Sequence, residues 1–205
     1  MQRVELAEGL IWWPGYLDRA AQEELAGDIA AALARAPLFT PRMPRTGAPF
    51  SVRMSNVGPL GWVSDVEGYR YQAFHPETRA PWPDFPARLL ALWSDLSGHP
   101  APPEAGLVNW YEPSARMGLH QDRDEQDFTA PVLSVSLGDT AVFRYGGSER
   151  RAPTRSIRLA SGDILLLSRE SRLAFHGIDR ILPGTSTLLD EPGRLNLTLR
   201  RVTPA

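Results

Sequence analysis

The chain has 205 residues and a formal net charge of −2, with 42% hydrophobic and 22% charged residues, a composition typical of an ordinary globular domain. It contains no cysteine and all of its 22 basic residues are arginine, which excludes disulfides, thiolate metal sites, cysteine nucleophiles and lysine Schiff bases. The net charge argues against a protein that binds nucleic acid by overall electrostatic attraction, although it does not exclude local basic patches. No apolar stretch reaches membrane-spanning length and no secretory leader is recognisable, so we expect a cytoplasmic protein with no membrane partner.

Two amphipathic helices are predicted in the first half of the chain. Residues 18–36 carry apolar side chains at four-residue spacing, with Asp18 in the N-cap position and Pro37 ending the helix. Residues 85–97 place leucines and Trp93 on one face, and a glycine follows as a C-terminal cap. Both helices are interpreted as scaffold.

The segment between the helices, residues 37–83, has a different composition. It is rich in proline, glycine and aromatic residues, and short alternating pieces at 50–54 and 68–71 predict small strands joined by turns. A segment of this kind is a candidate cover over a site. The alternative is a surface excursion whose aromatic side chains simply pack down.

From Gly106 onward the pattern predicts β-structure. Short apolar or alternating runs are separated by turn-forming residues, which indicates a sandwich or barrel such as a jelly roll. No internal repeat or linker is evident, so a single domain is expected. The predicted strands cover residues 107–112, 132–137, 141–145, 156–159, 164–167 and 195–202.

A candidate metal site lies in this β-rich part. His120 and Asp122 are two residues apart, and residues i and i+2 of an extended chain point to the same side. His176, expected after another strand, completes two nitrogen ligands and one oxygen ligand with open positions, the set used by non-haem Fe(II) oxygenases. An H-x-D pair alone is weak evidence because it arises often by chance.

Three stretches read together are more specific. An H-x-D within residues 107–125, a distant histidine within 171–178 and an R-x-N-x-T-x-R motif over 194–200 occur in this order. The combination resembles the AlkB family of Fe(II)- and 2-oxoglutarate-dependent dioxygenases, which reverse alkylation damage in nucleic acids. The resemblance spans about residues 50–202. It also includes residues 56–62, 68–71 and 130–138.

The resemblance implies a fold and a division of the chain. The expected class is α+β, mainly β, with a double-stranded β-helix (jelly-roll) core, two supporting helices and an aromatic-rich nucleotide-recognition lid. Residues 1–205 would form one dioxygenase domain. Its parts would be an N-terminal segment and helix (1–36), the lid (about 37–83) and a helix with the catalytic core (about 84–205).

The resemblance also implies the cofactors. His120, Asp122 and His176 would hold Fe(II) as the catalytic metal, with 2-oxoglutarate and O2 as co-substrates. Arg194 would pair with the distal carboxylate of 2-oxoglutarate, because arginine matches a carboxylate bidentately, and Arg200 would lie near the metal-bound carboxylate. The R-x-N-x-T-x-R spacing puts all four polar side chains on one side of a strand. Further hydrogen bonds to the co-substrate are expected from Asn109, Tyr111 and Asn196.

The implied reaction is oxidative demethylation of bases such as 1-methyladenine and 3-methylcytosine. Decarboxylation of 2-oxoglutarate would be coupled to hydroxylation of the methyl group, which leaves as formaldehyde. The target would be single-stranded or flipped out of a DNA duplex, with RNA as a further substrate. Trp62 would stack on the base, Tyr69 would lie near its phosphate and Asp124 would read its exocyclic amine. The expected substrate-binding set is completed by Glu125, Arg150 and Ser134.

Alternatives stay open at this point. One is an oxygenase of the same chemistry that acts on modified RNA or tRNA bases. A second is a cupin-like binding module without turnover, and a third is a zinc hydrolase, which leaves the R-x-N-x-T-x-R arginines without a role. Leu167 and Glu149 depart from the family pattern and leave the lesion preference open. We expect a monomer with no obligate protein partner.

Overall fold

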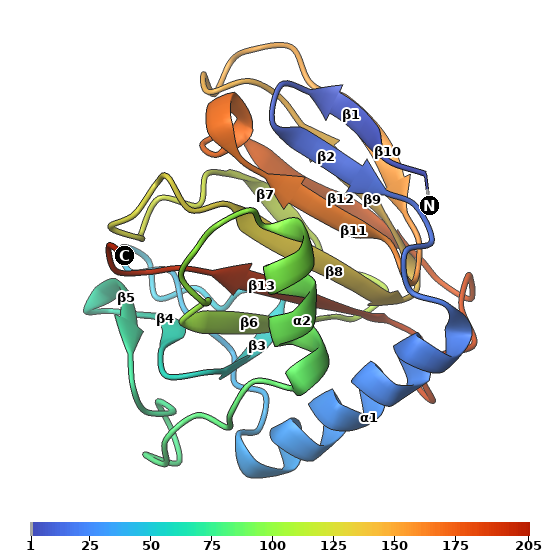
Figure 1. Cartoon of the computed structure of the whole chain (residues 1–205). Helices are drawn as coiled ribbons and strands as arrows, with labels where there is room; N and C mark the ends of the chain where they lie inside the picture. Colours follow the sequence, from blue (N-terminus) through green and yellow to red (C-terminus); the bar gives the residue numbers. More distant parts are fainter. Residues whose placement is uncertain (1) are drawn as a thin grey trace.

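The computed structural model describes residues 2–205 and is mainly β, as expected (Figure 1). Every strand pairing in it is antiparallel. The strands are β1 (Val4–Ala7), β2 (Leu10–Trp13), β3 (Arg53–Val57), β4 (Gly61–Asp65), β5 (Gly68–Gln72), β6 (Ala105–Tyr111), β7 (Met117–His120), β8 (Val132–Gly138), β9 (Thr140–Tyr145), β10 (Arg155–Leu159), β11 (Ile164–Leu167), β12 (His176–Leu182) and β13 (Arg194–Arg200).

Two facing sheets form the jelly roll. The larger has seven strands in the order β1-β2-β11-β8-β13-β6-β3, and the smaller has four in the order β10-β9-β12-β7. Consecutive strands of the chain often lie in different sheets, because β7 leads to β8 across the sandwich and β12 leads back to β13. The two sheets therefore bring distant parts of the sequence to the same interior space.

Two helices cover the outer face of the larger sheet. The helix α1 (Arg19–Arg35) begins where the Asp18 side chain accepts a hydrogen bond from the Ala21 amide at 2.8 Å, which confirms the predicted N-cap. The helix α2 (Ala87–Leu96) starts two residues later than expected and lies across β6 and β13 in Figure 1. Apolar side chains of both helices pack on the outward residues of β6, β8, β11 and β13. Neither helix is long and apolar enough to cross a bilayer.

The residues of β13 alternate between the two faces of the large sheet. Leu195, Leu197 and Leu199 join the core under the helices, whereas the alternate residues of the strand line an interior cavity. All seven residues are buried, so the strand carries buried polar groups on its inner face. These groups need partners, since an unpaired buried charge is costly.

The segment 37–83 supplies both a core strand and a separate hairpin. The strand β3 begins three residues later than the expected run 50–54 and forms the edge of the large sheet beside β6. The strands β4 and β5 form a two-stranded hairpin, with Trp62 opposite Tyr71. Asn56 fixes the hairpin because its side-chain amide donates to the Trp62 carbonyl at 3.1 Å and accepts from the Trp62 amide at 3.0 Å.

The sequence predicts that each histidine of the candidate metal site follows a strand. The structure instead places both histidines within strands. His120 is the last residue of β7 and His176 is the first residue of β12, and the two residues face each other across this strand pair. Neither strand is evident from the sequence. The strand β7 is only four residues long, and β12 has charged residues at positions that the alternating pattern would make apolar.

Candidate functional site

The three predicted ligands converge at one end of the sandwich. The candidate ligand atoms of His120, Asp122 and His176 all lie within 4.8 Å of one another. The His120 Nε2 is 3.7 Å from the Asp122 carboxylate, and the His176 Nε2 is 3.8 Å from it. This separation suits three atoms that surround one ion. The cross-strand pairing of the histidines, together with the i+2 spacing of the carboxylate, produces it.

The hydrogen bonds of both histidines favour metal binding through Nε2. The Nδ1 atom of His120 lies 3.0 Å from the Gly118 carbonyl, and that of His176 lies 2.9 Å from the Ala174 carbonyl. A carbonyl only accepts, so each Nδ1 carries the proton and donates it, and each Nε2 keeps a free lone pair. Burial lowers the pKa of His176 to about 4, which keeps this ring neutral and ready to act as a ligand.

The carboxylate of Asp122 is held in its charged form. Burial opposes its ionisation, but the Arg200 guanidinium, 3.0 Å away, and the two histidines outweigh that cost, so the pKa of Asp122 lies well below its usual value. The same pair raises the pKa of Arg200 against the effect of burial. Arg200 thus contacts the candidate metal ligand itself, and a ligand carboxylate that is ionised at neutral pH suits a divalent cation.

A cavity of about 860 Å³ includes the site, and we call the part around its buried lining residue Arg194 the closed end. This side chain is 1% exposed, and Nη2 donates to the Ser136 hydroxyl at 3.0 Å. The Nε and Nη1 atoms have no hydrogen-bond partner among residues 2–205. Burial lowers the pKa of Arg194 to about 10. A buried guanidinium without a counter-charge is what an anchor for an incoming carboxylate requires.

The other predicted co-substrate residues surround this guanidinium. The Tyr111 ring lies 5.4 Å from the Arg194 guanidinium carbon, and burial raises the pKa of Tyr111 to about 12. The Asn109 side-chain oxygen is buried and has no partner within the described residues, so it is available to a ligand. Asn196 instead uses its amide group internally, donating to the Ser134 hydroxyl at 2.7 Å and to the Val135 carbonyl at 3.0 Å. Ser134, expected among the substrate residues, therefore lies beside the co-substrate residues.

At the mouth of the cavity the predicted substrate residues contact one another. The Trp62 and Tyr69 rings are stacked with centroids 5.6 Å apart and an angle of 18° between their planes. The Trp62 Nε1 donates to the Asp124 carboxylate at 2.8 Å, so the hairpin is tied to the loop that follows β7. Arg150 lies at the rim, where it donates to the Leu119 carbonyl at 3.3 Å and its guanidinium faces the Phe175 ring.

Glu125, also expected to bind substrate, lies in a buried ionic cluster. Its carboxylate is 3.0 Å from the Arg172 Nη2 and 3.4 Å from the Arg200 Nε, and it accepts a hydrogen bond from the Tyr71 hydroxyl. Tyr71 and Arg172 are not predicted as site residues from the sequence. The only available signal was the position of Arg172, four residues before His176, which does not show where a side chain points.

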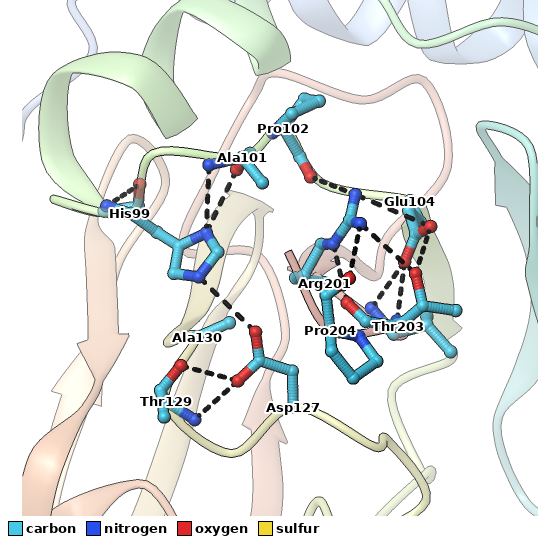
Figure 2. Close-up of polar contacts among 12 residues, drawn as sticks. His99, Ala101, Pro102, Glu104, Asp127, Thr129, Ala130, Arg201, Thr203 and Pro204 are labelled. Atoms are coloured by element: carbon cyan, nitrogen blue, oxygen red, sulfur yellow. Dashed lines mark hydrogen bonds and ion pairs between the residues drawn. The ribbon is translucent and has the colours of Figure 1, made fainter.

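The far end of the loop that carries Asp122 is anchored in a second polar cluster (Figure 2). The Asp127 carboxylate accepts from the Thr129 amide at 2.9 Å and lies 3.4 Å from the His99 Nε2. The Gln126 amide donates to the Val202 carbonyl at 2.8 Å. Glu104 in turn accepts from the amides that follow β13, at 2.9 and 2.7 Å. This cluster joins the loop to the C-terminal segment and leaves the metal side of the loop facing the cavity.

The fold and the site together define a class of protein. The model of the 2OG-Fe(II) oxygenase superfamily matches residues 9–200, so the chain belongs to that superfamily. It uses Fe(II) and 2-oxoglutarate, and the residues fit both: three converging ligands with free lone pairs, and a buried arginine with unpaired donors.

Relatives place the chain within the AlkB dioxygenases. The Alpha-ketoglutarate-dependent dioxygenase AlkB homolog of Caulobacter vibrioides (strain NA1000 / CB15N) is 56% identical over 202 residues, which are 98% of this chain and 91% of the relative. The Alpha-ketoglutarate-dependent dioxygenase AlkB of Escherichia coli (strain K12) is 39% identical over 185 residues, covering 88% and 85%. The solved structure described as "The structure of OsALKBH1" superposes with a TM-score of 0.84 at 31% identity, covering 98% of this chain and all of that one.

Proposed function

We propose that this dioxygenase is an oxidative demethylase of alkylated bases, of the 1-methyladenine and 3-methylcytosine type, in single-stranded DNA and in RNA. The observation that carries the proposal is the set of groups that line one cavity, graded by burial. They are an arginine that is 1% exposed and has two nitrogen atoms without partners among residues 2–205, three converging candidate metal ligands, and a stacked Trp62–Tyr69 pair bonded to Asp124, in which Tyr69 is 46% exposed. Membership in the AlkB dioxygenases supports the same substrate class.

The closed end binds the co-substrate. The free donors of Arg194 would pair with the distal carboxylate of 2-oxoglutarate, and Asn109 and Tyr111 would contact the rest of the molecule. Fe(II) with 2-oxoglutarate and O2 supplies the oxidation of the methyl carbon. The buried walls exclude water and fix the co-substrate against the ligands His120, Asp122 and His176.

The mouth selects the base. A planar ring is held well by stacking, and Trp62 and Tyr69 present aromatic faces over the cavity. Methylation at N1 of adenine or N3 of cytosine makes the ring cationic, and Asp124 would attract such a ring and accept a hydrogen bond from its exocyclic amine. A base reaches this depth only outside a duplex stack.

The family assignment weakens two alternatives. A zinc hydrolase gives the buried Arg194 no function, and a binding module without turnover does not need the complete ligand set. An oxygenase specific for RNA or tRNA bases differs from the proposed enzyme only in the polymer that it accepts. A direct comparison of DNA and RNA strands separates these two.

The test is turnover of a single-stranded oligonucleotide with one 1-methyladenine, in the presence of Fe(II), 2-oxoglutarate and ascorbate. We expect loss of the methyl mass and release of formaldehyde with the wild type and none with His120→Ala. The same sequence made as RNA should also react. Succinate formation without any change in the base would refute the substrate assignment while leaving the metal site intact.

A further inference from the structure

Glu125 is a buried carboxylate on which three separate segments converge. Its Oε1 accepts from the Tyr71 hydroxyl of β5 and lies 3.4 Å from the Arg200 Nε of β13. Its Oε2 accepts from the Arg172 Nη2 at 3.0 Å, from the segment that leads to β12. Two hydrogen bonds and one ion pair within the chain therefore hold this carboxylate. The residue is 5% exposed, so little of it is left for a substrate to contact.

Both arginines that contact Glu125 also contact Asp122. The Arg200 Nη2 lies 3.0 Å from the Asp122 carboxylate, and the Arg172 Nη1 donates to the Asp122 backbone carbonyl at 2.7 Å. One contact fixes the side chain of the metal ligand and the other fixes its backbone. A continuous set of polar contacts thus runs from Tyr71 through Glu125 to Asp122.

On the C-terminal side of Glu125, the loop is held in place by several hydrogen bonds. The Gln126 amide donates a hydrogen bond to the carbonyl of Val202, which follows β13. The Arg172 Nε donates to the Ala130 carbonyl at 2.8 Å. The Asp127 cluster of Figure 2 adds a further anchor. The chain that follows Glu125 is thus held in place, and the side-chain contacts of Glu125 lead through Arg172 and Arg200 to Asp122.

The hairpin contacts this loop through one cross-strand pair. Trp62 and Tyr71 face each other in the β4–β5 register, and they donate to the neighbouring carboxylates Asp124 and Glu125. Burial is the main cause that raises the pKa of Tyr71 well above its usual value, so its hydroxyl stays a proton donor at neutral pH. The hairpin that covers the cavity is thereby fastened to the residues that directly follow the metal ligand.

We propose that Glu125 is a positioning residue that couples the β4–β5 hairpin to the metal ligand Asp122, with Tyr71 as the contact on the hairpin side. Because coupling between two binding sites is reciprocal, metal binding stabilises the hairpin, and loss of the Tyr71 contact weakens metal binding. This inference rests on the metal centre and is independent of which alkylated polymer is the substrate.

The first test measures Mn²⁺ affinity without 2-oxoglutarate or oligonucleotide. Removing an outer partner of a metal ligand costs about 10- to 100-fold in affinity. Glu125 acts one contact further out, through Arg172 and Arg200, so Glu125→Gln should weaken Mn²⁺ binding by roughly 10-fold, the lower end of that range. Tyr71→Phe keeps the ring and removes one hydrogen bond, and about threefold is expected. The control is Tyr16→Phe, which removes a tyrosine hydroxyl on the outer side of the large sheet, where Tyr16 packs against the core under the helices. It should bind Mn²⁺ as the wild type does.

The second test uses the wild type and avoids any folding defect of the variants. Amide hydrogen exchange in β4 and β5 is compared with and without Mn²⁺ and 2-oxoglutarate. We expect slower exchange in the hairpin when the site is loaded, and a smaller change in Tyr71→Phe. Unchanged hairpin exchange on loading, or wild-type Mn²⁺ affinity in Tyr71→Phe, would overturn the coupling. Failure of the demethylation assay would leave both measurements interpretable, because neither contains a methylated base.

Discussion

The two ends of the cavity differ in how their polar groups are satisfied. At the closed end, Arg194 is 1% exposed and keeps two nitrogen atoms without partners among the described residues. At the mouth, Trp62 is already bonded to Asp124 and stacked on Tyr69, which is 46% exposed. The closed end is therefore preorganised for an anion. At the mouth, the polar and aromatic groups already contact one another, and a bound base would have to replace these contacts. Rigid sheet strands form the first end, and a hairpin and a loop form the second.

The largest effect is expected between the two ends, at the metal ligand itself. Asp122→Ala removes a ligand outright, which should exceed the effect of losing an outer partner, so Mn²⁺ affinity should fall by at least about 100-fold. The variant also leaves Arg200 without its nearest counter-charge. Metal titration of the purified variant measures this, and near-wild-type affinity would show that Asp122 is not a ligand. Asp28→Ala is the control, because it removes an exposed carboxylate from α1 on the outer face of the large sheet.

A substitution of Arg194 at the closed end is expected to have opposite effects on stability and on activity. Arg194→Met removes a buried charge that has no counter-ion, so the ligand-free protein should gain on the order of 1–3 kcal/mol of unfolding free energy. The same change should raise the KM for 2-oxoglutarate by roughly 100-fold, because a buried charged partner is lost. Thermal unfolding of the ligand-free protein measures the first effect, and steady-state kinetics with varied 2-oxoglutarate measures the second.

The matched variant is Arg200→Met, on the same face of the same strand. It should destabilise the protein, since it leaves Asp122 and Glu125 without a shared cation. If Arg194→Met were instead less stable than the wild type and still stabilised by 2-oxoglutarate, the preorganised anion site would be disproved.

Features of the site that depend on residues close together in the sequence could be predicted from the sequence. The polar face of residues 194–200 follows from strand periodicity alone, and the H-x-D spacing gives the convergence of His120 and Asp122. Both depend on neighbours within a few residues of one another. The helices were likewise predictable from their apolar spacing and from the Asp18 cap, and their observed bounds differ by at most a few residues.

The rest depends on contacts between distant segments. The strand β12 and the short β7 form because each pairs with a neighbour, and their own residues give little sign of it. Arg172 contacts a loop that lies 42 to 50 residues earlier in the chain, so its role is invisible without the fold. The same holds for Glu125, which the family resemblance placed with the substrate residues and which the fold surrounds with arginines and Tyr71.

At the mouth the expected effects are smaller. Trp62→Ala removes a stacking face worth about 1–3 kcal/mol per base, so the KM for a methylated oligonucleotide should rise roughly 10-fold or more. Trp62→Phe keeps a stacking face and loses the bond to Asp124, and it should fall between the alanine variant and the wild type. In both variants the KM for 2-oxoglutarate should change much less than in Arg194→Met. An equal rise in both KM values would show that the two ends are not separate sites.

The smallest effect is expected on the outer face, away from both ends. Asp18→Ala removes the N-cap of α1, which should cost about 1 kcal/mol of unfolding free energy. The buried residues of α1 pack on the opposite side of the large sheet from the cavity, so the KM for 2-oxoglutarate and for the oligonucleotide should stay at wild-type values. Chemical denaturation and steady-state kinetics on the same preparation check both. The variant supplies the baseline for the others, because it shows how a loss of stability of this size acts on activity when no contact in the cavity is touched. A rise in either KM with Asp18→Ala would mean that the effects at the mouth reflect general destabilisation rather than lost stacking.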